Sequence, residues 1–216
     1  ALGGAGVGAA CAAGRGEAMK VSVFDYGAGN LHSLIKTLAR DGARVEIETD
    51  PSAAARTDVL VLPGVGAFGH AAARMASGLA DLRSALADGL PCLGICLGMQ
   101  LLFDASDEGE GDGLGVFPGR VKRLEGGRVP QIGWNTIECA DDPLLDTAPL
   151  RTAYYANSYV CHPDDVDCVH AWSMHRSTRF AALVRAGRTV GVQFHPEKSS
   201  TPGVELVRAF LREAAQ

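Results

Sequence analysis

Two short apolar runs constrain the fold of this chain more than any other feature of its sequence. Residues 59–62 (VLVL) and 92–95 (CLGI) contain no polar side chain, so neither run alternates between apolar and polar positions. A strand has this composition when both faces of its sheet are buried, as in parallel sheets covered by helices on both sides. Segments with helical spacing, at about residues 30–40 and 71–87, separate the runs. The first half of the chain therefore predicts a doubly wound α/β layer with a mostly parallel sheet.

The remaining segments extend this layer. Residues 21–24 and 45–48 are expected to be further strands, and residues 97–103 are expected to begin a buried helix. From residue 114 onward, short apolar segments broken by turn residues predict a smaller antiparallel extension. Its strands are expected at about residues 119–124, 132–138, 154–160, 169–174, 180–185 and 189–194. An amphipathic helix that begins near Ser200 completes a three-layer α/β fold.

Composition bounds the number of domains and the class of ligand. The chain has 216 residues and is 47% hydrophobic, which suits one compact domain. Its first 18 residues are almost wholly Ala and Gly without periodicity, so we expect residues 1–18 to be a disordered extension and residues 19–216 to form the domain. The formal net charge of -5, without a basic stripe, argues against nucleic acid as a ligand.

The cysteine pattern indicates a reducing compartment. The six cysteines include no CxxC pair and no repeated ligand spacing, which predicts free thiols in the cytoplasm and no zinc or other metal site. No apolar run approaches the roughly 18 residues that a membrane span needs. We therefore expect a cytoplasmic protein that binds neither metal nor membrane.

Cys96 is the candidate nucleophile. It lies in Gly94-Ile95-Cys96-Leu97-Gly98, a G-x-C-x-G form of the sharp strand-to-helix turn that exposes a reactive side chain above a parallel sheet. Glycines tolerate the crowding of such a turn, and the N-terminus of the following helix favours a thiolate. A buried structural cysteine is the alternative for a lone Cys on an apolar strand, and we accept it for Cys92.

A cysteine nucleophile needs a base and a group that orients the base. His195-Pro196-Glu197 supplies both, because a short strand ends at His195 and the rigid proline allows the Glu197 carboxylate to fold back onto the imidazole. The other histidines lack such a setting, so they are expected to be surface or turn residues. We therefore predict that His195 is the base and Glu197 its orienting group.

The glycine-rich loop after residues 59–62 has two possible uses. Gly64-x-Gly66-x-x-Gly69 matches a dinucleotide fingerprint, but it follows the third strand, and no acidic ribose-binding residue ends the next strand. The alternative is that backbone N–H groups of Val65 and Gly66, together with that of Leu97, bind a developing oxyanion beside the cysteine. The cysteine and histidine motifs favour the oxyanion loop.

In this order the motifs resemble those of the class I (triad) glutamine amidotransferases, and the resemblance covers residue 19 to the C-terminus. Within that family the chain is similar to the glutaminase subunits of imidazole glycerol phosphate synthases. The motifs that carry the narrower likeness are Tyr26-Gly27-Ala28-Gly29-Asn30, Pro63-Gly64-Val65-Gly66, Gly94-Ile95-Cys96-Leu97-Gly98-Met99-Gln100, Pro130-Gln131-Ile132-Gly133-Trp134-Asn135 and His195-Pro196-Glu197-Lys198-Ser199. Anthranilate and aminodeoxychorismate glutaminases fit less well, since they typically have a Gly-Pro loop and a His before the Gln.

The resemblance implies a flavodoxin-like fold and a reaction without a cofactor. Cys96 would attack the side-chain amide of glutamine, His195 would shuttle the proton, and Glu197 would orient His195. The residues that would bind the substrate are Gly64, Val65, Gly66, Leu97, Gln100, Glu108, Ser158 and Tyr159, the last two through their main chains. One departure is Asn157, which stands where the family usually has His.

A partner is also implied by the resemblance. It is a (β/α)8-barrel cyclase that forms a heterodimer with the glutaminase, receives ammonia through an internal tunnel, and makes imidazole glycerol phosphate and AICAR in histidine biosynthesis. The matching interface or allosteric positions are Asn30, Gln131, Trp134, Asn135 and Lys198. We expect the isolated chain to be nearly inactive, because glycines on both sides of Val65 allow its carbonyl, not its N–H, to point into the site.

Other classes of protein make different predictions. A cysteine hydrolase or chaperone of similar fold would lack the His-Pro-Glu motif and would release no ammonia from glutamine. A dinucleotide-binding module would bind nicotinamide or flavin cofactors. An inactive regulatory subunit is disfavoured because Cys96, His195 and Glu197 are all present.

Overall fold

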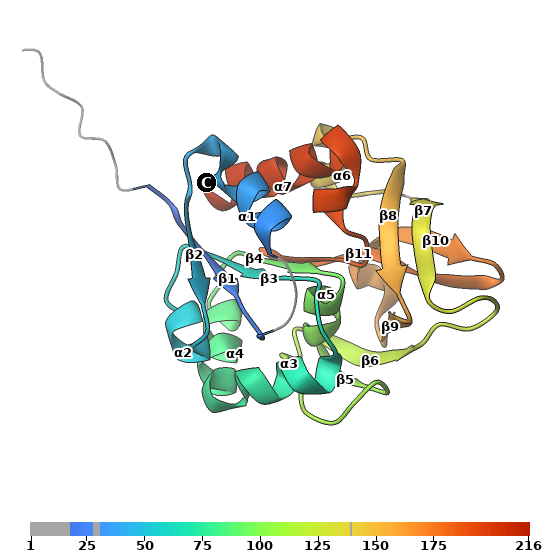
Figure 1. The fold of residues 1–216 in the computed structure, drawn as a ribbon, viewed down its shortest axis with the longest axis horizontal. Helices are drawn as coiled ribbons and strands as arrows, with labels where there is room; N and C mark the ends of the chain where they lie inside the picture. Colours follow the sequence, from blue (N-terminus) through green and yellow to red (C-terminus); the bar gives the residue numbers. More distant parts are fainter. Residues whose placement is uncertain (1–17, 28–30, 139) are drawn as a thin grey trace, which may run out of the picture.

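The computed structural model describes residues 18–27, 31–138 and 140–216 (Figure 1). Residues 1–17 lie outside this description, and with them most of the expected disordered extension. Among the residues described, every helix is too short or too polar to cross a membrane.

A seven-stranded sheet, in the order β10-β11-β12-β4-β3-β1-β2, forms the centre of the molecule. Its strands are β1 (Lys20–Phe24), β2 (Arg44–Glu48), β3 (Val59–Leu62), β4 (Cys92–Ile95), β10 (Val169–His175), β11 (Thr178–Ala186) and β12 (Thr189–Val192). β2, β1, β3, β4 and β12 are parallel, and β11 is antiparallel to both of its neighbours, β12 and β10. The predicted mostly parallel sheet is therefore confirmed.

Helices cover both faces of this sheet (Figure 1). On one face lie α1 (His32–Leu38), α6 (Pro143–Thr147) and α7 (Ser200–Ala214), and on the other lie α2 (Pro51–Ala54), α3 (Phe68–Met75), α4 (Leu79–Ala87) and α5 (Leu97–Leu101). Short 3-10 turns occur at η1 (Ala39–Asp41), η2 (Ala76–Gly78), η3 (Val166–Cys168) and η4 (Pro196–Lys198).

The two helical layers explain why β3 is apolar throughout. Val59 and Val61 pack in the hydrophobic cluster that includes α1 and α7, while Leu60 and Leu62 pack in the cluster that includes α3 and α4. Because successive side chains point to opposite faces of a strand, both sets must be apolar. The expected three-layer fold is thus confirmed.

Two smaller sheets flank the carboxyl ends of the parallel strands. One contains β5 (Phe103–Ser106), β6 (Phe117–Arg123) and β9 (Tyr159–Pro163), and the other is an antiparallel ribbon of β7 (Gln131–Thr136) and β8 (Thr152–Asn157).

The strands expected at residues 169–174, 180–185 and 189–194 do not belong to a separate antiparallel extension: β10, β11 and β12 continue the central sheet, and β12 is parallel to β4.

Two boundaries predicted from the sequence are also wrong. Phe103 begins β5 and pairs with Phe117 in place of continuing a helix, because α5 ends at Leu101. The single strand expected over residues 154–160 is divided at Ser158, whose carbonyl accepts a hydrogen bond from the Leu124 N–H at 2.9 Å. The chain thereby passes from the β7–β8 ribbon to the sheet of β5, β6 and β9.

Two short helices were not predicted, although each has a sequence signal. Asp50 caps α2 by accepting from Ser52 N, and Asp142 caps α6 by accepting from Leu144 N. In both helices a proline occupies the first turn, where its missing N–H costs nothing. An Asp-Pro pair was the available signal.

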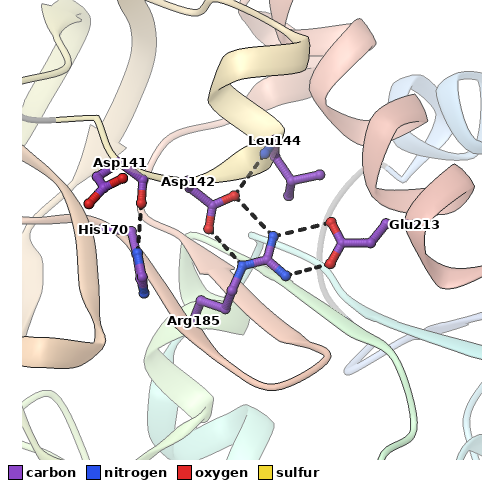
Figure 2. Close-up of polar contacts among 6 residues, drawn as sticks. All are labelled: Asp141, Asp142, Leu144, His170, Arg185 and Glu213. Atoms are coloured by element: carbon purple, nitrogen blue, oxygen red, sulfur yellow. Dashed lines mark hydrogen bonds and ion pairs between the residues drawn. The ribbon is translucent and has the colours of Figure 1, made fainter.

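An ion cluster joins α6, β11 and α7 (Figure 2). The Arg185 guanidinium lies between two carboxylates: Asp142 Oδ2 at 2.6 Å from Nε and Glu213 Oε1 at 2.6 Å from Nη1. The Asp142 side chain is fully buried, whereas that of Glu213 is 41% exposed. Burial lowers the pKa of Arg185, but the hydrogen bonds that Arg185 donates to Asp142 and Glu213 outweigh it and raise that pKa above its usual value. The cluster ties three elements of the fold together.

Replacing Asp142 by Ala is expected to destabilise the fold much more than replacing Glu213 by Gln. Asp142→Ala leaves a mostly buried guanidinium with one carboxylate and removes the cap of α6, so the free energy of unfolding should fall by about 3 kcal/mol or more. Glu213→Gln removes a solvated partner and should cost less than about 1 kcal/mol. Urea denaturation measures both losses. Equal losses for the two variants would contradict this ranking.

Candidate active site

Three neighbouring parallel strands end at one edge of the central sheet. β4 is hydrogen-bonded to β3 on one side and to β12 on the other. The segments that follow these strands carry Gly64 after β3, Cys96 after β4 and His195 after β12. The carboxyl edge of a parallel sheet is where active sites of α/β folds form.

Cys96 occupies a strained turn between β4 and α5. Its φ of 50° and ψ of -101° are unusual for a residue with a side chain. The backbone holds this conformation from both sides, because Cys96 N donates to Val192 O at 2.7 Å and Cys96 O accepts from Gln100 N at 3.1 Å. Only 6% of Cys96 is exposed.

The glycine at the first turn of α5 allows the close packing that this turn requires. A Cβ at Gly98 would overlap the carbonyl of Leu62 in β3. A Cβ at Gly94 would lie 2.7 Å from Gly98 O, closer than real side-chain contacts. The two glycines that flank Cys96 therefore let α5 start directly against the neighbouring strand.

His195 and Glu197 form a buried pair beside the sulfur. His195 Nδ1 lies 2.9 Å from Glu197 Oε1, and the side chains are 3% and 10% exposed. Burial lowers the pKa of His195, but hydrogen bonds with Cys96 and Glu197 outweigh it and raise that pKa to about 9. The contacts with Cys96 and Glu197 therefore favour the protonated imidazole.

The backbone of His195 is fixed by the β7–β8 ribbon. His195 N donates to Tyr154 O at 2.8 Å, and Ser199 Oγ donates to His195 O at 2.7 Å. The same Ser199 Oγ accepts from Tyr154 N at 2.9 Å. Ser199 was not predicted as a site residue, although it lies within the His195-Pro196-Glu197-Lys198-Ser199 motif.

Gly64 lies between the cysteine and the histidine. A Cβ at this position would be 2.9 Å from both Cys96 Cβ and His195 Cε1. Val65 is partly buried against the core, and Gly66 has a φ of 108°, which a residue with a side chain rarely adopts. With Leu97 as the first residue of α5, the expected oxyanion loop and the nucleophile meet at one point.

Gln100 and Glu108 each make a hydrogen bond with the backbone of another segment. Gln100 is 4% exposed and its Nε2 donates to Tyr159 O at 3.1 Å. Glu108 Oε2 accepts from Phe68 N at 2.9 Å, at the beginning of α3. This carboxylate occupies the helix N-terminus at which a dinucleotide fingerprint would bind a phosphate.

The carbonyl groups of Ser158 and Tyr159 are engaged within the protein. Ser158 O accepts from Leu124 N, and Tyr159 O accepts from both Gln100 Nε2 and Asn157 Nδ2. Asn157 thus helps to fix the loop where the family usually has His, and it is itself 4% exposed.

The expected interface residues are dispersed around the β7–β8 ribbon. Trp134 is 55% exposed and makes an edge contact with the Tyr154 ring, with centroids 6.3 Å apart. Asn135 Nδ2 donates to Met174 O, Lys198 is exposed beside the site, and Gln131 is buried at the start of β7. Asn30 lies outside the described residues.

Gln193 is the other residue at the site that was not predicted. Its Nε2 lies 3.5 Å from Cys96 Sγ, and none of its surface is exposed. The signal in the sequence was a lone polar residue among apolar ones just after β12. Within the described residues, no group of three or more His, Cys, Asp or Glu side chains could hold a metal ion.

Known proteins are similar to this chain in sequence, and solved structures are similar to it in fold. Imidazole glycerol phosphate synthase subunit HisH of Synechococcus sp. (strain JA-3-3Ab) is 40% identical over 208 residues, which cover 93% of this chain and 96% of that protein. The subunit of the same name from Natronomonas pharaonis is 42% identical over 202 residues, covering 89% of this chain and 94% of that protein.

Solved structures are more distant in sequence. A crystal structure of a glutamine amidotransferase has a TM-score of 0.69 at 21% identity and covers 91% of this chain and 99% of its own. The structure of PurLQS from Thermotoga maritima has a TM-score of 0.70 at 16% identity, with 93% of this chain and 100% of that chain covered. At such identity these structures establish the fold alone.

A family model described as glutamine amidotransferase class-I matches residues 22–214, which include every strand and helix from β2 to α7 and most of β1. The chain therefore belongs to the class-I glutamine amidotransferase family.

Proposed function

We propose that this chain is the glutaminase subunit of an imidazole glycerol phosphate synthase, and that it hydrolyses glutamine to glutamate and ammonia through a thioester on Cys96. The observation that carries the proposal is the buried His195–Glu197 pair against the strained cysteine at the edge of the sheet. Relatives named as subunits of that synthase, at about 40% identity over most of the chain, support the choice of enzyme.

The reaction needs one nucleophile and one proton carrier. Cys96 Sγ attacks the amide carbon of glutamine, and the carbon–nitrogen bond then breaks as the nitrogen takes a proton from His195 and leaves as ammonia. A water molecule next attacks the thioester and gives a proton to His195. Glutamate leaves, the sulfur is restored, and one water has been consumed for each glutamine. Glu197 keeps His195 oriented and stabilises its charged form.

Substrate binding is assigned to the residues around this pair. Backbone N–H groups of Val65, Gly66 and Leu97 stabilise the oxyanion of the tetrahedral intermediate, with Gly64 allowing the close approach. Gln100 and Glu108 bind the amino-acid end of glutamine, next to the main chain of Ser158 and Tyr159. The free thiols of the described cysteines, Cys92, Cys96, Cys161 and Cys168, support a cytoplasmic site of action.

The β7–β8 ribbon is the proposed docking surface for a (β/α)8-barrel cyclase that receives the ammonia. Ile132 and Trp134 are 68% and 55% exposed, which is unusual for large apolar side chains on one strand. Tyr154 contacts Trp134 and also accepts the hydrogen bond from His195 N. A partner that contacts Trp134 is therefore separated from His195 only by Tyr154. Gln131, Asn135, Lys198 and Asn30 complete the proposed interface and allosteric positions.

Glutamate release with and without a barrel cyclase of this synthase class tests the proposal. We expect the complex to hydrolyse glutamine and the isolated chain to be slower by about 10²–10³-fold, the loss expected when one oxyanion donor is missing. Cys96→Ala should abolish turnover in the complex. Equal activity of wild type and Cys96→Ala would refute the nucleophile, and equal activity of free and bound chain would refute the dependence on a partner.

Glu197→Gln is expected to move the alkaline limb of kcat to lower pH. With the Glu197 charge removed, burial is opposed by Cys96 alone, so the pKa of His195 falls from about 9 and the imidazolium that protonates ammonia is lost earlier as pH rises. Turnover at neutral pH should fall by about 10²-fold. The measurement is the pH profile of kcat in the complex, with the surface variant Glu205→Gln as control. An unchanged alkaline limb in Glu197→Gln would count against this role.

Trp134→Ala is expected to weaken binding of the cyclase by about 2 kcal/mol, because a large aromatic side chain at the centre of an interface is a common hot spot. Ile47→Ala serves as the matched control, since Ile47 on β2 is also 55% exposed but lies on the far edge of the sheet. Calorimetric titration with the cyclase measures both affinities. The docking surface lies elsewhere if the two variants bind equally well.

A further inference from the structure

Gln193 is a polar residue in an apolar part of the core. It lies directly after β12, between Val192 and Phe194, both of which belong to the hydrophobic cluster that contains Cys96. Its backbone N–H donates to Ala182 O at 3.0 Å, and its side chain is wholly buried. A glutamine is rarely buried so completely unless its amide has specific partners.

The partners of this amide form a chain of hydrogen bonds that ends on the sulfur. Gln100 Nε2 donates to Tyr159 O at 3.1 Å and to Gln193 Oε1 at 3.4 Å. Gln193 Nε2 then donates to Cys96 Sγ at 3.5 Å. The chain therefore runs from the backbone at the start of β9, through two buried side chains, to the nucleophile.

The backbone decides which end of each amide faces the sulfur. The carbonyl of Tyr159 can only accept, so Gln100 must present its NH₂ group there. The second proton of that group is directed at Gln193, which must present its oxygen in return. The NH₂ group of Gln193 is thereby left facing Cys96, and a flipped amide would lose both of its contacts.

The sulfur has contacts of opposite kinds. Ala156 O, at 4.0 Å, can accept the proton of the thiol, whereas Gln193 Nε2 can only donate to sulfur. Because Cys96 is almost wholly buried in a hydrophobic cluster, water contributes little to solvating a charge on it. A fixed N–H donor in this place favours the ionised sulfur over the neutral one.

We propose that Gln193 is a catalytic residue whose side-chain N–H stabilises the Cys96 thiolate, and that Gln100 orients this donor. The proposal rests on the role of Cys96 as nucleophile. It gives the buried amides a function separate from that of His195, which carries the proton. It also places Gln100 in contact both with the proposed substrate site and with the group that activates the sulfur.

Alkylation of Cys96 by iodoacetamide tests the proposal on the full chain. The rate is followed by mass spectrometry of the Cys96 peptide from mildly acid to alkaline pH, which reports the ionised sulfur directly. Gln193→Met retains the length of the side chain but has no donor. It should move the midpoint of the alkylation rate's pH dependence upward by roughly one to two pH units, which is a 10- to 100-fold loss of rate at neutral pH. Gln100→Met should cause a smaller upward shift, because Gln193 remains but is no longer oriented.

Thr189→Val is the matched control. Thr189 is also buried on β12 but begins the strand at its other end, so its loss should leave the midpoint unchanged. If Gln193→Met has the midpoint of the wild type, or if Thr189→Val shifts it equally, the proposal is wrong. Because alkylation needs no glutamine, this failure is distinct from an absence of glutaminase activity.

A measurement on the wild-type chain covers the case in which Gln193→Met does not fold. The side-chain N–H resonances of Gln193, in protein labelled with ¹⁵N, should shift with pH at the midpoint that alkylation gives. They should also change when Cys96 is alkylated. If the resonances shift neither with pH nor on alkylation of Cys96, the proposal is overturned. In the complex with the cyclase, Gln193→Met should lower kcat by roughly 10-fold or more with a smaller change in KM, whereas a structural support for substrate binding would mainly raise KM.

Discussion

The parallel pairing of β4 with β3 on one side and β12 on the other is the constraint on which the site depends. Leu62 is in register with Gly94, and Ile95 with Val192, so the three strands end at nearly the same level. Each strand is then followed by one part of the proposed site: the Gly64 loop, the proposed nucleophile Cys96 and the proposed base His195. Cys96 and His195 are about a hundred positions apart in the sequence, and they meet because the hydrogen bonds between β4 and β12 align their backbones.

Burial of ionisable groups is the energetic difficulty of this arrangement. A cysteine, a histidine and a glutamate lie almost out of contact with water, where each charge must be compensated by a neighbour. His195 is compensated on both ring sides, by Glu197 and by the sulfur. In the described part of the protein, Glu197 Oε2 is buried without a hydrogen-bond partner. No competing donor in that part of the chain therefore draws the carboxylate away from the imidazole.

The features predicted from sequence are those set by local pattern. β3 and β4 were located to the residue because four consecutive positions without a polar side chain suit a strand that is buried on both faces. The His195-Pro196-Glu197 segment was found because its residue types imply a function. Failures occurred where tertiary contacts decide. Phe103 ends an apolar segment with helical spacing, but it lies in β5 because it pairs with Phe117. Residues 154–160 divide at Ser158 because the Leu124 N–H donates to the carbonyl of Ser158. The sequence marks Gln193 only as a lone polar residue among apolar ones, and its contacts could not be predicted because its partners lie on α5 and directly after β4.

The strained conformation of Cys96 has a consequence for how the protein can change. A positive φ is a conformation that glycine adopts freely and cysteine does not, so the turn between β4 and α5 would be more relaxed without the side chain of the proposed nucleophile. The surrounding glycines and the hydrogen bond to Val192 hold the residue in place against this preference. At this position the backbone conformation favours glycine whereas the proposed reaction needs cysteine, so the demands of stability and of activity are opposed.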